Sequence, residues 1–317
     1  MSSSQPCRPL YVLTGPTAVG KTELALRWAE RNGAEIISCD SLLFYRGMDI
    51  GTAKPTAEER ARVPHHLVDV CDVRERMDVT RYVEAVRLAL ADLDARGRRV
   101  LVTGGSGFYL RAFFAPVADD VAVDPRLRSE LETRLERDGL QSLVGELKAC
   151  DAEGASTIDL QNPRRVLRAL ERVRSSGRGL KELAEAFARR PPPFAGWSVR
   201  LVRLERSPEA LGQRLAERVR VMLATGLEEE VRALEARGLR DNPSAARAIG
   251  YREVLDVMDG RIPRSGLEAA IVANTRSLVK KQRTWFRTQL PEHRCLEAAT
   301  AQVETLFDGS DEVSPRD

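Results

Sequence analysis

The sequence predicts an α/β protein in which a mostly parallel sheet carries an inserted helical lobe. Three features indicate this fold. Short apolar segments alternate with helical segments from Leu10 to Thr103, a glycine-rich loop joins the first strand to the first helix, and the pattern turns almost wholly helical and highly charged near Asp124. Strands that alternate with helices are typical of a parallel sheet covered by helices on both faces.

The elements of the predicted core follow from hydrophobic periodicity and from turn residues. In chain order they are a strand at 10–14, a turn at 15–20, a helix at 21–31, strands at 35–39 and 66–70, a helix at 79–96, and strands at 99–103 and 199–204. Asp40 comes directly after the second strand. Its side chain is therefore expected at the carboxyl end of the sheet, where ligands bind in open α/β folds.

The chain is predicted to be helical again beyond residue 204. Ser207 is a suitable N-cap, with Pro208 at the first helical position. Ser265 and Glu268 have the spacing of a capping box, which predicts a helix from this point to about Arg287.

These changes of pattern divide the chain into three parts. We expect an α/β catalytic core formed by residues 8–120 and 196–295, an inserted helical lobe at 121–195, and an acidic tail at 296–317. The tail is expected to fray at its end, as chain termini often do.

Composition excludes several classes of protein. The 317 residues are 43% hydrophobic, which allows a sizeable core, and no apolar run is long enough for a signal sequence or a membrane span. The five cysteines are scattered and never spaced as C-x-x-C, so neither a disulfide framework nor a structural zinc site is indicated. We expect a soluble cytoplasmic protein with no membrane partner.

The distribution of charge is more informative than the net charge of +3. Residues 164–190 hold nine Arg or Lys against three Glu, and residues 276–294 hold six against one. Such stretches fit a nucleic-acid phosphate backbone, and they fit solvated helix faces equally well. Taken alone, they leave both interpretations open.

The loop after the first strand matches the phosphate-binding pattern G-x-x-x-x-G-K-[ST]. Its residues are Gly15, Pro16, Thr17, Ala18, Val19, Gly20, Lys21 and Thr22. Glycines let backbone N–H groups close around phosphate oxygens, the lysine supplies a mobile charge, and the threonine hydroxyl can ligate Mg²⁺. Because the loop follows a strand and opens a helix, it predicts a P-loop NTPase-like core.

The companion motifs of a nucleotide hydrolase are missing. The strand at 99–103 ends in Gly104-Gly105 without the aspartate that would hold Mg²⁺, and no Asn-Lys-x-Asp guanine motif occurs. The second strand instead delivers Asp40-Ser41 to the carboxyl end of the sheet. An aspartate there can act as a base, bind a metal or merely cap a turn.

Eight ordered blocks resemble the signature of the tRNA dimethylallyltransferase family, in its bacterial form without a zinc-finger extension. The blocks are Gly15-Pro-Thr-Ala-Val-Gly-Lys-Thr22, Asp40-Ser41, Tyr45-Arg-Gly-Met-Asp-Ile-Gly-Thr-Ala-Lys-Pro55, Pro64-His-His-Leu-Val-Asp69, Gly104-Gly-Ser-Gly-Phe-Tyr-Leu110, Arg168-Ala-Leu-Glu171, Ala248-Ile-Gly-Tyr-Arg252 and Thr284-Trp-Phe-Arg287. Together they cover the chain from about Leu10 to Arg287.

The resemblance implies transfer of a dimethylallyl group from dimethylallyl diphosphate to the exocyclic amine of the adenosine 3′ of the anticodon. It implies Mg²⁺ on Thr22, Asp40 as the base that takes the amine proton, and Ser106 at the position of the family's threonine. The implied catalytic residues are Lys21, Thr22, Asp40, Ser106, Arg214 and Arg218. Of the last two, which lie one helical turn apart, we expect one to face the pyrophosphate.

The resemblance also implies a tRNA anticodon stem-loop as partner, with the target base flipped out of its stack. The implied tRNA contacts are Asp40, Ser41, Leu42, Leu43, Arg164, Arg165, Arg168, Arg247, Gly250, Tyr251, Arg252, Lys280, Lys281, Arg283 and Arg287. Leu43 and Arg164 depart from the glutamines usual in the family, which bears on how flanking bases are read. We expect the enzyme to be a monomer.

Two apparent metal motifs are interpreted as structural. His65 and His66 point to opposite sides of a strand, and Asp119-Asp120 with Asp124 lacks the spacing of an aspartate-rich diphosphate box. Two other functions stay open on the residues alone: a P-loop small-molecule kinase, and a non-catalytic RNA-binding protein that uses the loop as an anion clamp.

Overall fold

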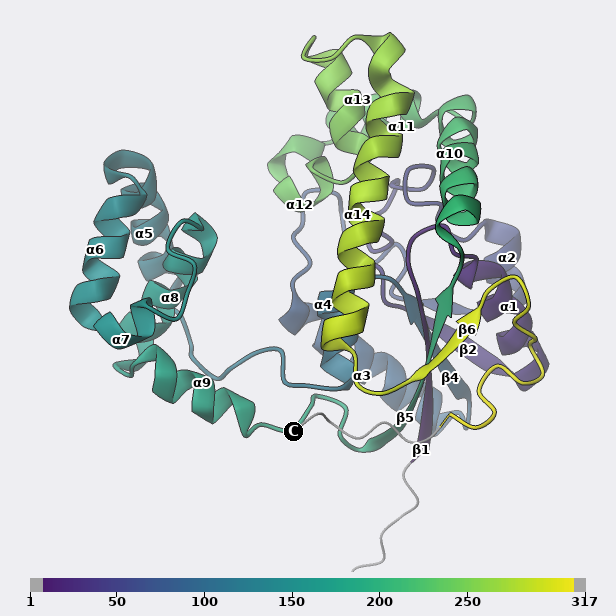
Figure 1. Cartoon of the computed structure of the whole chain (residues 1–317), viewed down its shortest axis with the longest axis horizontal. Helices are drawn as coiled ribbons and strands as arrows, with labels where there is room; N and C mark the ends of the chain where they lie inside the picture. Colours follow the sequence, from purple (N-terminus) through teal and green to yellow (C-terminus); the bar gives the residue numbers. More distant parts are fainter. Residues whose placement is uncertain (1–7, 311–317) are drawn as a thin grey trace, which may run out of the picture. The chain divides into compact units, whose positions relative to one another are not determined.

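The computed structural model describes residues 8–310. The described residues form two compact units, 8–117 with 192–310, and 118–191 (Figure 1). The smaller unit is inserted between two strands of the larger one. Its bounds differ by three or four residues from those of the helical lobe predicted at 121–195.

A six-stranded parallel sheet forms the centre of the larger unit. Its strands lie in the order β3-β2-β4-β1-β5-β6. They are β1 (Arg8–Thr14), β2 (Ala34–Ser38), β3 (His65–His66), β4 (Arg99–Gly104), β5 (Trp197–Glu205) and β6 (Arg294–Glu297). Leu10, Val12, Val102 and Leu204 are fully buried, as expected of strands covered on both faces. The predicted α/β class is confirmed.

Helices flank this sheet and extend beyond its carboxyl end (Figure 1). They are α1 (Lys21–Asn32), α2 (Ala57–Arg62), α3 (Val79–Ala95), α4 (Gly107–Leu110), α10 (Pro208–Ala224), α11 (Leu227–Glu235), α12 (Pro243–Ala246), α13 (Tyr251–Met258) and α14 (Leu267–Gln289), with 3₁₀ turns at Arg111–Phe113, Leu239–Asp241 and Arg264–Gly266. The long helices α10 and α14 pack against each other, and α11 packs against α13. Side chains from α10 and α14 reach the loops that follow β1 and β4.

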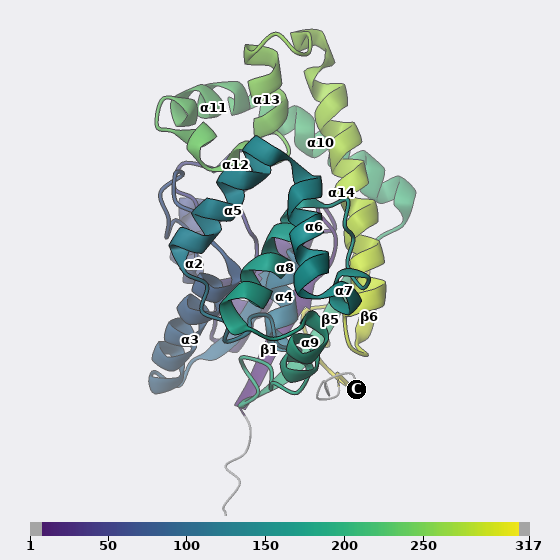
Figure 2. The same ribbon diagram turned by 90° about the vertical axis from the view of Figure 1, so that its left-hand side faces the viewer.

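The smaller unit is a helical bundle with its own core. It contains α5 (Pro125–Asp138), α6 (Leu140–Cys150), α7 (Ala152–Ala155), α8 (Pro163–Ser176) and α9 (Leu180–Ala188). In Figure 2, α5, α6 and α8 lie side by side, and their apolar faces bury Leu131, Leu143, Leu147, Val166 and Leu170 completely. This unit therefore has a hydrophobic core of its own.

Two predictions about elements need correction. The strand predicted at 66–70 pairs only through His65–His66, because Leu67 and Asp69 adopt left-handed φ angles of +60° and +59° that end the strand. Ser265 does not cap α14. A 3₁₀ turn at Arg264–Gly266 precedes that helix, and Gly266 is its N-cap without a side-chain bond.

The chain beyond α14 forms more structure than the sequence suggested. β6 adds a parallel strand beside β5, and Val303, Leu306 and Phe307 are buried beyond it. The ring of Phe307 lies 4.9 Å from that of Tyr11 and 5.0 Å from that of Trp28. The acidic tail is thus packed on the core up to residue 310, and its end at 311–317, which we expected to fray, lies outside the described residues.

Candidate active site

The phosphate-binding loop connects β1 to α1 in a conformation that needs small residues. Gly15 and Gly20 have φ angles of +150° and +110°, and Ala18 has +65°. A Cβ atom on Gly15 would lie 2.6 Å from the carbonyl oxygen of Leu204 in the adjacent strand β5. The loop can therefore approach the sheet closely only with glycine at this position.

Lys21, the first residue of α1, folds back over the loop. Its ammonium group donates hydrogen bonds to the carbonyl oxygens of Gly15 (2.7 Å) and Pro16 (2.9 Å). Burial lowers the pKa of Lys21 to about 8, while the negative charge of Asp40 opposes this shift and the positive charge of Arg218 adds to it. A half-buried cation thus lies at the loop, close to one carboxylate and a second cation.

Asp40 and Ser106 meet at the carboxyl ends of β2 and β4. The hydroxyl of Ser106 accepts a hydrogen bond from the backbone N–H of Ser41 at 2.9 Å. A Cβ atom on Gly104 would lie 2.1 Å from the carbonyl oxygen of Cys39, so glycine allows the two strand ends to lie this close. The structure therefore brings Asp40, Ser41 and Ser106 together.

The carboxylate of Asp40 has one structural contact. Its Oδ1 accepts the backbone N–H of Leu42 at 3.0 Å, which is a turn-capping role. Within residues 8–310, its Oδ2 has no hydrogen-bond partner. One oxygen holds the turn, and the other has no partner among these residues.

Leu42 and Leu43 continue this turn and are half-buried. The carbonyl oxygen of Leu43 accepts the backbone N–H of Asp69 at 3.0 Å, which fixes its backbone beside the end of β3. Both leucines therefore lie on the turn that follows Asp40.

Three arginines, one directly after β5 and two on α10, surround the loop. Arg206 and Arg214 donate through Nε to the carbonyl oxygens of Val19 (3.3 Å) and Ala18 (3.1 Å). Arg218, one turn further along α10, donates to the carbonyl oxygen of Thr52 at 3.1 Å. Burial lowers the pKa of Arg218, and the charge of Asp40 opposes that shift. Arg214 thus lies on the loop itself, and Arg218 lies near Lys21 and Asp40.

Sequence reasoning missed one residue that joins two halves of the site. The amide oxygen of Gln282 in α14 accepts the backbone N–H of Thr17 (3.0 Å), and its NH₂ group donates to the carbonyl oxygen of Gly105 (3.0 Å). Gln282 stands three residues after the buried Val279 and four before the buried Phe286, so it belongs to the inward face of α14. The spacing of Gln282 from the apolar residues Val279 and Phe286 could have indicated that its side chain faces inward.

Thr22 is exposed at the start of α1. Its hydroxyl makes no hydrogen bond to any residue that the structure describes. No cluster of three or more His, Cys, Asp or Glu side chains suited to a metal occurs in residues 8–310. The site therefore offers no all-protein metal cage, but it fits the usual magnesium arrangement of one or two protein ligands completed by substrate phosphates and water.

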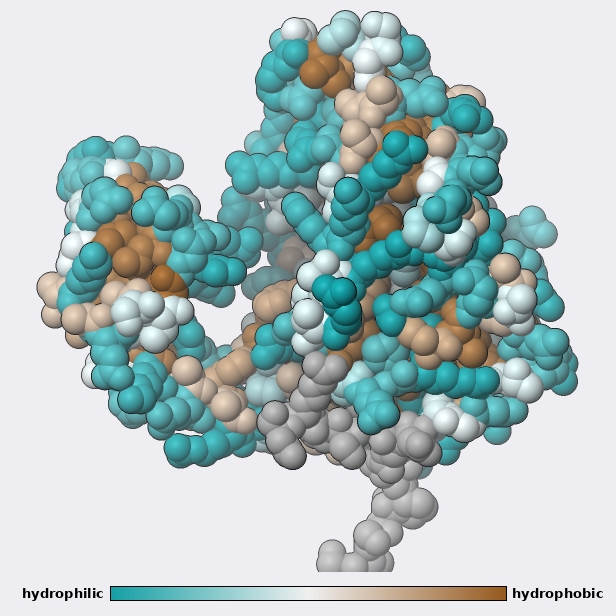
Figure 3. All heavy atoms as spheres, viewed as in Figure 1, coloured by the Kyte–Doolittle hydropathy of each residue, from teal (hydrophilic) through white to brown (hydrophobic). Residues whose placement is uncertain are grey.

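The basic end of α14 contributes two kinds of residue. Lys280, Lys281 and Arg287 are exposed and have no carboxylate partner within the described chain. Arg283 is half-buried and donates to the carbonyl oxygen of Arg206 at 2.6 Å, so it supports the loop after β5. Figure 3 shows hydrophilic side chains over much of this face of the larger unit, with apolar patches between them.

The basic stretch of the smaller unit is mostly neutralised. Seven of its nine cations contact carboxylates, namely Arg168, Arg172, Arg174, Arg178, Lys181, Arg189 and Arg190. Arg168 pairs with the buried Glu171 at 3.0 Å. Arg164 and Arg165 are exposed at the start of α8 without such a partner in the described residues. These two are the cations left free to meet a phosphate backbone.

The predicted tRNA contacts at 247–252 are only partly at the surface. Arg247 is exposed, and Arg252 is half-buried with a 2.5 Å ion pair to Glu253. Gly250 and Tyr251 are buried, and Tyr251 is completely inaccessible to solvent. The ring of Tyr251 packs in the core, and a tRNA contact at this residue stays a prediction.

The apparent metal motifs have structural partners. His66 contacts Glu35 at 2.8 Å, and His65 contacts the carbonyl oxygen of Val63. Asp119 and Asp120 pair with Arg172 and Arg190. Each of these four side chains therefore has a partner within the protein.

Comparison with known proteins identifies the family. A family model described as IPP transferase matches residues 43–289. The chain is 60% identical over 300 residues to the tRNA dimethylallyltransferase of Opitutus terrae, covering 94% of this chain and 96% of that protein. The chain belongs to the IPP transferase family. It is also 40% identical over 303 residues to the tRNA dimethylallyltransferase of Deinococcus radiodurans, covering 94% and 96% of the two chains.

The fold of this IPP transferase family member is also similar to that of solved transferase structures. The tRNA isopentenylpyrophosphate transferase of Bacillus halodurans superimposes with a TM-score of 0.67 at 32% identity, over 95% of this chain and 94% of that one. A eukaryotic dimethylallyltransferase acting on tRNA gives a TM-score of 0.79 at 24% identity, over 96% and 76% of the two chains, which supports the fold alone. In the described part of the chain, no helix combines the length and apolar character needed to cross a bilayer.

Proposed function

We propose that this family member transfers a dimethylallyl group from dimethylallyl diphosphate to the exocyclic amine of the adenosine 3′ of the anticodon, releasing pyrophosphate. One observation carries the proposal. A phosphate-binding loop after β1 and a carboxylate with an available oxygen, Asp40 after β2, lie at the carboxyl end of the same sheet. The charge of Asp40 acts on the nearby cations Lys21 and Arg218. This arrangement suits an anionic leaving group beside a proton acceptor.

The diphosphate binds in the loop formed by residues 15–22. Backbone N–H groups and the N-terminus of α1 attract its oxygens, and Lys21 exchanges its loop carbonyls for a phosphate oxygen. Arg214 lies on the outer side of the loop and Arg218 on the side of Asp40. Both arginines add positive charge where the pyrophosphate gains negative charge as it leaves.

The transfer step breaks the bond between the allylic carbon and the diphosphate oxygen. The amine nitrogen of adenine forms the new bond to that carbon. Because the amine lone pair is delocalised into the ring, nitrogen becomes acidic as the bond forms, and the free oxygen of Asp40 accepts its proton. Ser106 positions the backbone of Ser41 beside this carboxylate.

Mg²⁺ is the metal that this site would hold. The exposed hydroxyl of Thr22 and the diphosphate oxygens are hard oxygen ligands of the kind that Mg²⁺ prefers. When bound, the ion would neutralise charge on the leaving pyrophosphate.

The anticodon stem-loop is the proposed RNA partner. Exposed cations available to its phosphates include Lys280, Lys281, Arg287 and Arg247 on the larger unit, and Arg164 and Arg165 on the smaller one. The target adenosine must leave the base stack to reach Asp40. We propose that the enzyme acts as a monomer, in the cytoplasm, where its tRNA substrate is found.

The direct test uses the purified protein, unmodified tRNA and Mg²⁺ with two labelled donors in separate reactions. Label from the prenyl group of dimethylallyl diphosphate should appear in tRNA. Label from the γ-phosphate of ATP should appear in no small-molecule acceptor. Phosphoryl transfer without prenyl transfer would identify a kinase, and tRNA binding without either reaction would indicate a non-catalytic RNA-binding protein.

A further inference from the structure

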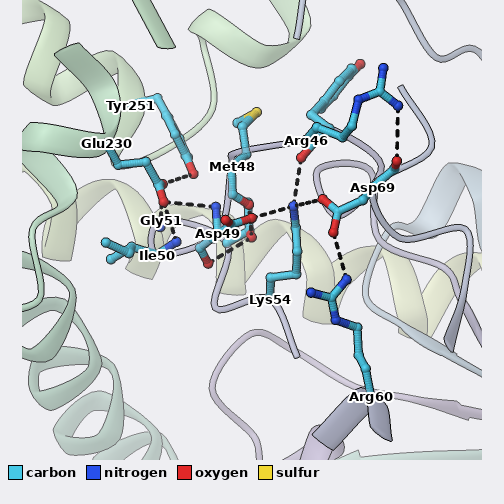
Figure 4. Close-up of polar contacts among 12 residues, drawn as sticks. Arg46, Met48, Asp49, Ile50, Gly51, Lys54, Arg60, Asp69, Glu230 and Tyr251 are labelled. Carbon is cyan, nitrogen blue, oxygen red and sulfur yellow. Dashed lines mark hydrogen bonds and ion pairs between the residues drawn. The ribbon is translucent and has the colours of Figure 1, made fainter. Parts of the chain in front are cut away.

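A loop outside the phosphate site is held by hydrogen bonds and ion pairs to several buried or half-buried side chains. It covers residues 45–54, between β2 and α2, and Figure 4 shows its contacts with α11 and α13. Its backbone carries no group that the proposed chemistry uses. One of its carbonyl oxygens, that of Thr52, nevertheless accepts the hydrogen bond from Arg218.

The carboxylate of Glu230 in α11 binds backbone N–H groups at the centre of this loop. Its Oε2 accepts the backbone N–H groups of Asp49 (3.0 Å) and Ile50 (2.7 Å), and its Oε1 accepts that of Gly51 (3.2 Å). The hydroxyl of Tyr251 also donates to Oε1, at 2.6 Å. Four donors thus converge on a single carboxylate (Figure 4).

The ring of Tyr251 sets how closely the loop approaches α13. A Cβ atom on Gly51 would lie 2.5 Å from that ring, so the loop backbone rests directly on it. Because Tyr251 is fully buried and its hydroxyl is bound to Glu230, neither side chain can shift without the loop.

The end of the loop is fixed by Lys54. Its side chain is 2% exposed, and its ammonium group contacts the carboxylates of Asp49 (2.6 Å) and Asp69 (2.5 Å) and the carbonyl oxygen of Tyr45 (2.8 Å). All three of its N–H donors therefore have acceptors. Arg60 pairs with the other oxygen of Asp69 at 2.8 Å. The carbonyl of Thr52 lies between these two fixed points of the loop.

We propose that Glu230 and Tyr251 are positioning residues for the reaction. By holding the backbone of residues 49–51, they place the carbonyl of Thr52 so that it directs Arg218 toward the pyrophosphate rather than into solvent. A long arginine side chain samples many rotamers unless its guanidinium is held, and a misplaced charge stabilises the leaving group less. This inference rests on the proposed function of the same site.

The test is a double-mutant cycle between Glu230→Gln and Arg218→Ala, read by single-turnover prenyl transfer at saturating tRNA. Glutamine keeps the size of Glu230, but its NH₂ group faces two of the four donors whichever way the amide is turned. The matched control is Glu229→Gln, which alters an exposed neighbour on α11 that pairs with Arg232 at 3.2 Å. Tyr251→Phe, which keeps the ring, should have a smaller effect.

We expect Glu230→Gln to slow transfer by about 10–100-fold and to weaken binding of inorganic pyrophosphate. Binding of tRNA in the absence of diphosphate should not change. In the Arg218→Ala background, Glu230→Gln should change the transfer rate and the Kd of pyrophosphate by less than about twofold each. The guanidinium that Glu230 is proposed to position is then absent. The loss of thermal stability should be equal in both backgrounds.

Equal fold losses from Glu230→Gln with and without Arg218 would overturn the proposal, because the residue would then act independently of that arginine. Should the wild-type protein transfer no prenyl group, the proposed function fails by itself. The cycle is then read on the Kd of inorganic pyrophosphate alone, where coupling supports the positioning role and additivity contradicts it.

Discussion

Lys21 shows how a single residue adapts to two tasks. Its ammonium group holds the phosphate loop through two carbonyl oxygens, and it is also the charge that meets the diphosphate. Burial favours the neutral amine, whereas the diphosphate favours the cation. The protonation state of Lys21 should therefore be coupled to substrate binding.

This coupling predicts a pH dependence of diphosphate affinity. In the free protein the pKa of Lys21 is about 8, so the cation is present below that pH and is lost as the pH rises through it. The second ionisation of a phosphate lies near pH 6, below this range. Affinity for dimethylallyl diphosphate should be full near neutral pH and should fall above about pH 8, as measured by calorimetry.

The matched control is Lys21→Arg, which stays charged throughout the range. Its affinity should be lower than that of the wild type near neutral pH because the geometry differs, yet flat with pH. A wild-type affinity that is constant across pH 8, or an equal fall in the variant, would mean that Lys21 does not control binding.

Single residues differed in how readily they could be predicted. Residues 15–22 and Asp40 could be identified because each belongs to a short motif that directly follows a predicted strand. Gln282 was not, since its partner Thr17 lies 265 residues away and the bond depends on how α14 packs. Tyr251 was assigned to RNA by resemblance, although its ring is buried.

At the scale of elements, Glu35 in β2 connects the edge strand β3 to the end of helix α3. This buried carboxylate of β2 accepts hydrogen bonds from Arg96 at 2.5 Å and 2.9 Å, just beyond α3, and contacts His66 of β3. The bonds from Arg96 lower the pKa of Glu35 to about 2, burial opposes that shift, and His66 adds to it. The short strand β3 depends on this cluster because only two of its residues pair with β2.

Glu35→Gln should destabilise the larger unit by about 2–3 kcal/mol at neutral pH. A carboxyl whose folded pKa lies below its unfolded value of 4.5 stabilises the fold above that pH, and loses this contribution as the pH falls toward 2. The difference between wild type and variant should therefore shrink in acid. Urea unfolding can follow it by fluorescence, since Trp28, Trp197 and Trp285 all lie in this unit.

Glu84→Gln is the control, because Glu84 is exposed on α3 and its contact with Arg87 is 3.9 Å. It should change stability little at any pH. An equal loss for Glu35→Gln at neutral and acid pH would show that the carboxyl charge contributes nothing.

Most elements could be predicted from periodicity, and the exceptions depend on backbone geometry or strand pairing that periodicity does not show. The strand predicted at 66–70 failed because left-handed backbone at Leu67 and Asp69, which L-residues rarely adopt, is not visible in an apolar pattern. β6 was missed because four residues beside β5 form a strand only through pairing with that neighbour. Ser265 failed as a cap because a 3₁₀ turn takes its place.

At the scale of the whole molecule, free cations occur on both units. Lys280 and Lys281 on α14 are exposed without carboxylate partners in residues 8–310, in contrast to seven of the nine cations in the stretch at 164–190. A cation that already pairs with a carboxylate gains less from a phosphate. The sequence could count these charges, but only the fold shows which are neutralised.

Replacing Lys280 and Lys281 together by alanine should weaken tRNA binding and flatten its salt dependence. The slope of log K against log salt should fall by roughly 0.7–0.9 for each phosphate that the variant no longer neutralises. Filter binding over a range of salt measures this slope. The pair Arg27→Ala and Arg87→Ala, on the exposed faces of α1 and α3, should leave it unchanged. A slope that falls equally in both pairs would assign the effect to net charge rather than to α14.

The central claim is that the carboxylate of Asp40 receives a proton from an adenine amine as the prenyl group leaves the phosphate loop. Single-turnover transfer with labelled dimethylallyl diphosphate, followed by nucleoside mapping of the tRNA, tests it most directly. The wild type should place the label on the adenosine 3′ of the anticodon. Asp40→Asn should bind both substrates but transfer about 10²–10⁴-fold more slowly. A near-normal rate for this variant, or its rescue by extra Mg²⁺, would contradict the account.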